Sequence, residues 1–108
     1  MKQSLLDNLL AFYQEEPTDP FNIYALALEY SKTDAVNAAR FFDILLAEHP
    51  AYLPTYYHAA AFFAMQENIE KAEKLYNDGI ALALKQNNLK THQELVRAYR
   101  GFLDEIED

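Results

Sequence analysis

Three histidines, His49, His58 and His92, are the side chains in this sequence best suited to metal binding or to proton transfer at neutral pH. Their spacing does not build a site on one helix, because no Glu-x-x-His or His-x-x-x-His pattern occurs. The sequence also contains no cysteine nucleophile, no glycine-rich phosphate loop and no Gly-x-Ser-x-Gly motif. We therefore predict that the chain is not an enzyme and has no catalytic residue, metal site or bound cofactor.

The composition favours a single small domain in a reducing compartment. The chain has 108 residues, a formal net charge of −8 and no cysteine. Such an acidic chain is poorly suited to nucleic-acid phosphates or to an anionic membrane surface. Asp7 and Asn8 interrupt the leucine-rich start, unlike a signal peptide. The longest stretch without formal charge, 49–66, includes two prolines and two histidines and does not predict a membrane span. We expect a cytoplasmic protein with no nucleic-acid or membrane partner.

Start and stop signals divide the sequence into six expected helices. Ser4 with Asp7 resembles a capping box that opens a helix at about 4–15, and Asp19 before Pro20 opens a second that runs to about Lys32. The later starts are marked by Thr33 or Asp34, by Pro54, by Asn68, and by Asn88 or Thr91. No stretch alternates with the period of a strand for long enough to predict one.

Two kinds of helix recur with a common period. The first, third and fifth helices share an i, i+4, i+7 pattern with a shift of 33 and then 34 residues: Leu5, Leu9, Phe12; Ala38, Phe42, Leu45; Ala72, Tyr76, Gly79. The second and fourth helices match at a shift of 33: Ile23, Leu26, Ala27, Tyr30; Tyr56, Ala59, Ala60, Phe63. Interleaved helices with one period indicate a helical repeat array.

These residues resemble the tetratricopeptide repeat. The matches are Leu26, Ala27, Tyr30, Ala38, Phe42 and Pro50 in the first repeat, and Tyr56, Ala60, Phe63, Ala72 and Tyr76 in the second. The sequence departs from the family at Ala59, where leucine is usual, and at Gly79, where alanine is usual. A glycine inside a helix costs roughly 1 kcal/mol relative to alanine. We therefore expect a neighbouring helix, such as the last one, to lie very close to Gly79.

The resemblance implies an all-α fold, a tetratricopeptide-like α-solenoid of antiparallel helix pairs in a right-handed superhelix. The expected organisation is that of a small bacterial-type member of the family, in one domain over 1–108. It comprises a lone N-terminal helix at 4–16, repeats at 20–50 and 53–86, and a closing helix at 89–106.

The resemblance also implies a binding groove, because the family's first helices line its concave side. The matching residues are Phe21, Tyr24, Leu28 and Ser31 in the second helix, and Tyr57, His58, Ala61 and Met65 in the fourth. Some members hold a carboxylate on this face with lysine, arginine and asparagine. Here the matching places hold Tyr24, Leu28, Tyr57 and Ala61, so that site is absent. We expect an apolar, aromatic or amphipathic protein segment as the ligand, and interpret His58 as groove lining.

The groove explains why residues 54–66 carry no Asp, Glu, Lys or Arg: this helix would pack on two neighbours and line the groove with its remaining side. Three coverings remain open: a partner protein, the closing helix or a second copy of the chain. The favoured function is a non-enzymatic interaction scaffold, the alternative is a structural or self-association role, and a third is an accessory subunit of an enzyme. Lys32, Arg97 and Arg100 could add charge at the groove edge, although Arg100 with Asp104 fits an ordinary ion pair on a solvent-exposed helix face.

Overall fold

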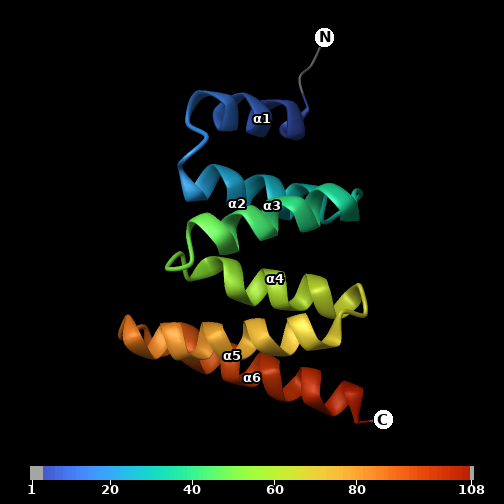
Figure 1. Ribbon diagram of the computed structural model, residues 1–108, viewed down its shortest axis with the longest axis vertical. Coiled ribbons are helices and arrows are strands. Elements are labelled where there is room, and N and C mark those ends of the chain that lie inside the picture. Colours follow the sequence, from blue (N-terminus) through green and yellow to red (C-terminus); the bar gives the residue numbers. More distant parts are fainter. Residues whose placement is uncertain (1–3, 108) are drawn as a thin grey trace. The chain divides into compact units, whose positions relative to one another are not determined.

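The computed structural model of the protein describes residues 4–107. Six helices occupy this part of the chain: α1 (Leu5–Glu15), α2 (Pro20–Tyr30), α3 (Ala35–Glu48), α4 (Pro54–Met65), α5 (Ile69–Lys85) and α6 (Leu89–Ile106) (Figure 1). Residues 4–107 contain no strand, so the predicted all-α fold class is confirmed. Residues 1–3 and Asp108, which the expected domain includes, lie outside the described residues.

Short polar side chains begin the helices, as the sequence predicts. At α1 the capping box is complete, because the Asp7 amide donates to Ser4 Oγ at 3.1 Å and the Ser4 amide donates to Asp7 Oδ2 at 3.3 Å. Of the alternatives left open by the sequence, Asp34 caps α3 and Asn88 caps α6. Each side chain accepts from an amide of the first turn that has no partner within the helix.

The turns before α5 and α6 have the same construction. Glu67 and Asn87 adopt positive φ angles of 63° and 61°. The amide that follows each donates to a carbonyl five residues back, Asn68 to Phe63 at 2.9 Å and Asn88 to Ala83 at 2.8 Å. This is the Schellman arrangement, in which one left-handed residue ends a helix. Asn68 and Asn88 therefore help to end one helix and cap the next, which reverses the chain within three residues.

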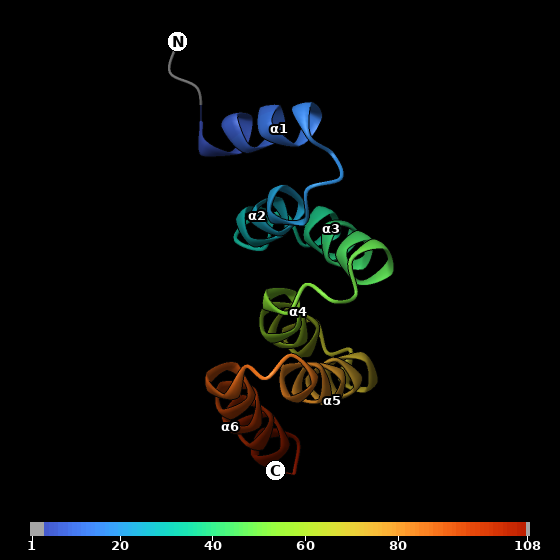
Figure 2. The ribbon, with the colours of Figure 1, turned by 90° about the vertical axis from the view of Figure 1, so that its left-hand side faces the viewer.

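The chain divides into two compact units, one ending at Thr55 and the other beginning at Tyr56. In the first unit, α2 and α3 lie side by side and α1 packs on α2 (Figure 2). Its buried apolar residues come from α2, α3 and Leu53: Ile23, Leu26, Ala27, Ala38, Phe41, Phe42, Leu45 and Leu53. The Tyr30 ring stacks on Phe41 at 5.7 Å, and Tyr13 of α1 meets Phe41 edge-on at 5.5 Å. α1 is therefore attached at the margin of the core and has no buried residue of its own.

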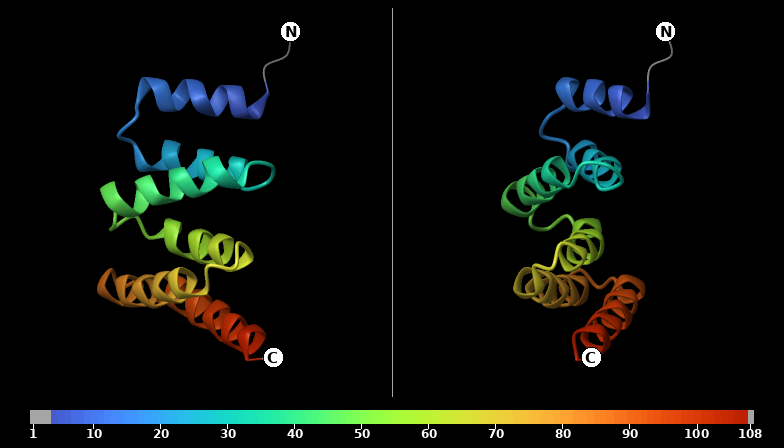
Figure 3. Two further views of the ribbon diagram at one scale, coloured as in Figure 1. Left: turned by 45° about the vertical axis from the view of Figure 1, so that its right-hand side comes forward. Right: turned by 90° about the vertical axis from the view of Figure 1, so that its right-hand side faces the viewer.

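In the second unit, α5 contacts both α4 and α6 (Figure 3). A Cβ atom added to Gly79 of α5 would lie 2.6 Å from the Tyr56 Cβ on α4 and 3.2 Å from the Leu95 Cδ1 on α6. The expectation that a neighbouring helix lies very close to Gly79 is confirmed: the closest approach is from α4, and the last helix, α6, comes next. None of the helices within residues 4–107 has the length and apolar character needed to cross a bilayer.

Candidate functional site

The predicted groove residues of α2 follow one side of that helix, since they recur at i, i+3, i+7 and i+10. Phe21 is exposed, with 58% of its surface accessible, while Tyr24 and Leu28 are half-buried. The Ser31 hydroxyl donates to the Leu28 carbonyl at 2.6 Å, which caps the end of α2. This hydroxyl is therefore an acceptor but not a free donor for a ligand.

The aromatic ring of Tyr24 lies against Tyr52, a residue of the α3–α4 connection that the repeat pattern does not mark. The two rings meet edge-on with centroids 5.7 Å apart. Loss of water around the ring raises the pKa of Tyr24, and so does its neighbour Tyr52. A pocket of about 400 Å³ adjoins Tyr52 and is lined also by Pro20, Glu48, His49, Pro50 and Ala51. No helical period marks residues 49–53, which is why their part in this surface is not visible in the sequence.

The predicted residues of α4 remain accessible. Tyr57 is 41% exposed and Met65 is 83% exposed, while Ala61 is half-buried. The exposed His58 ring meets Tyr57 edge-on at 5.4 Å, and partial loss of water lowers the pKa of His58 below the ordinary 6.5. The other sides of α4 are buried, which accounts for the absence of charge in residues 54–66: Thr55, Tyr56, Ala59, Ala60, Phe62 and Phe63.

Two of the predicted groove residues of α4, Ala61 and Met65, line a pocket of about 330 Å³ between α4 and α6. The other lining residues are Ala64 of α4, Tyr76 of α5, and Ala98, Gly101, Phe102 and Glu105 of α6. The residues from α6 were missed because the two predicted repeats, 20–50 and 53–86, end before that helix. The sequence holds one signal for this part of the pocket, which is the glycine inside the expected last helix. A Cβ added to Gly101 would have no described atom within 4 Å, so packing within residues 4–107 does not require glycine there.

α6 does not cover the accessible side of α4, since Met65 and Tyr57 stay exposed beside it. The alternative in which the closing helix covers the predicted groove therefore does not hold for Met65 and Tyr57. The ion pair expected from the Arg100–Asp104 spacing is also not formed, because neither residue is ion-paired within residues 4–107.

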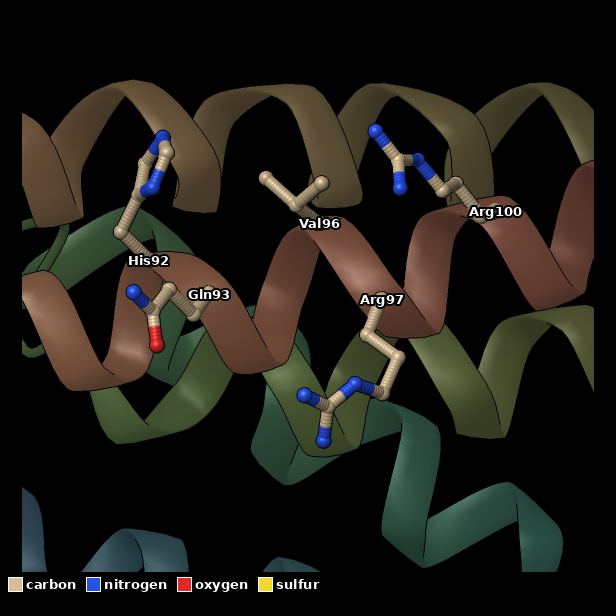
Figure 4. A pocket seen from close by; sticks show the side chains of 5 residues that line it. All are labelled: His92, Gln93, Val96, Arg97 and Arg100. Carbon is tan, nitrogen blue, oxygen red and sulfur yellow. The ribbon is translucent and has the colours of Figure 1, made fainter.

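A third pocket, of about 260 Å³, lies on the opposite flank of α6 and is lined by His92, Gln93, Val96, Arg97 and Arg100. Figure 4 shows His92, Val96 and Arg100 in a row along one edge of the helix, with Gln93 and Arg97 on the adjacent edge. No group of three His, Cys, Asp or Glu side chains within residues 4–107 could hold a metal ion.

Solved structures with the same fold are known. A solution structure of a tetratricopeptide repeat domain protein from Salinibacter ruber is 34% identical in sequence with a TM-score of 0.75, over 81% of this chain and 89% of that chain. A crystal structure of a tetratricopeptide repeat domain protein from the same organism is 33% identical with a TM-score of 0.73, over 80% of this chain and 97% of that chain.

A protein from Bordetella parapertussis is 17% identical with a TM-score of 0.81, over 96% of this chain and 91% of that chain, a likeness of fold alone. No protein-family model matches the sequence, and a search of curated proteins returns no match.

Proposed function

Because the chain belongs to the tetratricopeptide repeat family, we propose that it is a protein-interaction module that binds an amphipathic helical segment of a partner protein. The proposed binding residues of the first unit are Phe21, Tyr24 and Leu28 of α2 with Ser31 at its end, and those of the second unit are Tyr57, His58, Ala61 and Met65 of α4. In the second unit the proposed surface extends to the pocket between α4 and α6.

That pocket is the observation that carries the proposal. Its walls are rich in small residues, Ala61, Ala64, Ala98 and Gly101, which leave room for a bulky side chain of a partner. Met65 at its rim is 83% exposed, and a flexible thioether side chain adapts to differently shaped apolar ligands. A large exposed apolar side chain beside a pocket marks an interaction site more often than an isolated one does.

Gly101 adds an independent reason. A glycine in the middle of an exposed helix costs roughly 1 kcal/mol relative to alanine. No described atom lies close enough to Gly101 to require it for packing. Glycine also permits a ligand to approach the helix backbone closely, and such an approach would account for its presence here.

The charge of the surface selects among partners. Glu105 lies at the pocket, and the chain as a whole carries a formal charge of −8. A partner segment with a leucine or phenylalanine anchor and a lysine or arginine one helical turn away would place its cation at Glu105. Acidic segments would be repelled, which gives specificity as well as faster association.

We further propose that this module has no catalytic step of its own and acts in the cytoplasm as a single repeat domain. The scattered positions of His49, His58 and His92 support the first part, and the absence of cysteine supports a reducing compartment.

The test uses a library of amphipathic helical peptides with leucine or phenylalanine at i, i+3, i+4 and i+7 and either lysine or glutamate on the flank. We expect lysine-flanked peptides to bind, measured by fluorescence anisotropy. Met65→Lys and Gly101→Phe should each weaken binding by roughly tenfold or more, because they alter the rim and fill the pocket.

Leu84→Lys is the matched control, since Leu84 is 54% exposed on α5 and does not line the pocket. Equal binding by Met65→Lys, Gly101→Phe and Leu84→Lys would place the peptide elsewhere. If no peptide of the library binds, the proposal is overturned.

A further inference from the structure

α1 exposes side chains whose counterparts in α3 and α5 are buried. In the repeat register, Leu5 corresponds to Ala38 and Ala72, which are fully buried, yet Leu5 is 57% exposed. Phe12 is 55% exposed, whereas its counterpart Leu45 is fully buried in α3. α3 is covered on this side by α2, the first helix of its pair. α1 therefore presents a second-helix face that no first helix covers within residues 4–107.

α6 has the complementary character of a first helix. Its residues His92, Leu95, Val96 and Tyr99 repeat the spacing of Ile23, Leu26, Ala27 and Tyr30 at a shift of 69, and the two sets share the leucine and the tyrosine. Ala27 is fully buried in the α2–α3 pair, whereas Val96 is half-buried and lines the 260 Å³ pocket. Leu89, on the same flank of α6, is 59% exposed.

The carboxyl end of α1 and the junction between α5 and α6 carry opposite charges. Residues 4–16 contain three carboxylates, Asp7, Glu15 and Glu16, and no lysine or arginine. Residues 79–93 contain Lys85 and Lys90 and no carboxylate. Glu15 and Glu16 also lie at the carboxyl end of α1, where the helix dipole disfavours them and no basic residue offsets them. The amino end of another helix would stabilise them.

From these observations we propose that α1 of one copy packs on α6 of a second copy and completes an α6–α1 helix pair equivalent to α2–α3. The observed approach of Tyr56 to Gly79 within the second unit gives the register. His92 is equivalent to Tyr56, and Phe12 is equivalent to Gly79. In the α4–α5 pair the first helix carries the larger of the two side chains, whereas in the α6–α1 pair the second helix carries it. Phe12 then lies against His92 and Leu89, Leu5 enters the pocket beside Val96, and Glu15 and Glu16 face Lys85 and Lys90.

Leu5 and Val96 stand where the repeats use two alanines, so this pair of helices is held wider apart than the alanine-lined pairs. Interhelical distances of about 8–10 Å accommodate such differences in side-chain size. Because the two faces differ, the contact is heterologous, and contacts of this kind either close into a ring or continue as an open chain. The proposal takes the open form, in which every dimer keeps one free α1 face and one free α6 face. Association therefore continues beyond two copies as the concentration rises.

The experiment is light scattering coupled to size exclusion, from low micromolar to near millimolar concentration. We expect a mass of 12.5 kDa at the lowest concentration that rises past twice this value without a plateau at the dimer. Raising the salt from about 0.05 to 0.5 M should shift the rise to higher concentration, because part of the contact is between exposed charges.

Two variants each remove one face: Phe12→Glu on α1 and Leu89→Glu on α6. Both side chains are more than half exposed, so neither change should disturb the fold. Each variant alone should stay monomeric, whereas an equimolar mixture retains one intact α6–α1 contact. The mixture should therefore reach the mass of a dimer and stop there.

Gln14→Glu, on the opposite side of α1, and Met65→Lys, outside the contact, are the controls, and both should associate like the original chain. A constant mass of 12.5 kDa at every concentration overturns the proposal. So does association that stops at a dimer and survives in Phe12→Glu or Leu89→Glu, which indicates a symmetric contact. Loss of association in Met65→Lys would move the contact to the proposed peptide surface.

Discussion

Replacing Gly79 with alanine should destabilise the second unit, although alanine is the better helix former. The backbone at Gly79 has no positive φ angle, so an alanine meets no conformational strain there. The obstacle is steric: the new Cβ would lie 2.6 Å from the Tyr56 Cβ and 3.2 Å from the Leu95 Cδ1. The Tyr56 Cβ is fixed to its backbone and cannot rotate away, so α4 and α5 must move apart.

Two opposing terms set the magnitude. Alanine in a helix is favoured over glycine by about 1 kcal/mol. Overpacking a close contact costs about 1–3 kcal/mol, and an approach of 2.6 Å between two Cβ atoms belongs to the upper part of that range. The free energy of unfolding should therefore fall by about 1–2 kcal/mol, with a drop in melting temperature of about 5–10 °C for a chain of this size.

The assay is urea unfolding followed by circular dichroism at 222 nm, with Gly101→Ala as the matched control. The same substitution at Gly101 meets no described atom within 4 Å, so only the helix preference acts and stability should rise by about 1 kcal/mol. The two variants should thus change stability in opposite directions at an unchanged m-value. If Gly79→Ala is as stable as Gly101→Ala, the close approach of α4 to Gly79 is wrong.

Three further features can each be tested by substitution. Glu67→Gly should stabilise the protein by about 1 kcal/mol in urea unfolding, because a non-glycine residue is strained at its φ of 63°; Asn87→Gly should gain less, since asparagine tolerates this conformation. Thr55→Val should raise stability by about 1 kcal/mol, because the buried Thr55 Oγ1 has no hydrogen-bond partner among residues 4–107; a loss of stability would reveal one. The lowered pKa of His58 means that the unfolded chain binds more protons below pH 6.5, so stability should fall as the pH drops through this range. His58→Gln should flatten that part of the pH profile, and an unchanged profile would assign it to another group.

The helix boundaries were accessible from the sequence because they are set locally. The Ser4–Asp7 capping box and the Asp19–Pro20 start depend on contacts between residues two or three positions apart. Pro54 and Asn68 likewise begin α4 and α5 where predicted. The repeat period follows from the same local patterns, which is why the residue spacing is sufficient to predict the fold class.

The residues of the candidate site were only partly accessible. Ala61 and Met65 were found through the repeat register, which carries positions from one helix to another. Gly101 and Glu105 were not, because α6 reaches the pocket by packing on α5 and no sequence period records that contact. The wider groove and the single repeat domain over 1–108 stay predictions.

Local sequence patterns therefore determine where each helix begins and which helices are alike. They also indicate that α4 needs neighbours on more than one side. Packing between distant helices selects which apolar side chains remain accessible, leaving Met65 and Phe12 exposed while Phe42 and Leu95 are buried. Hydrophobicity drives all four side chains toward burial but does not specify which helix each one packs against. That choice is fixed only when distant helices pack. Within residues 4–107, α1 and α6 each keep one face that no helix covers.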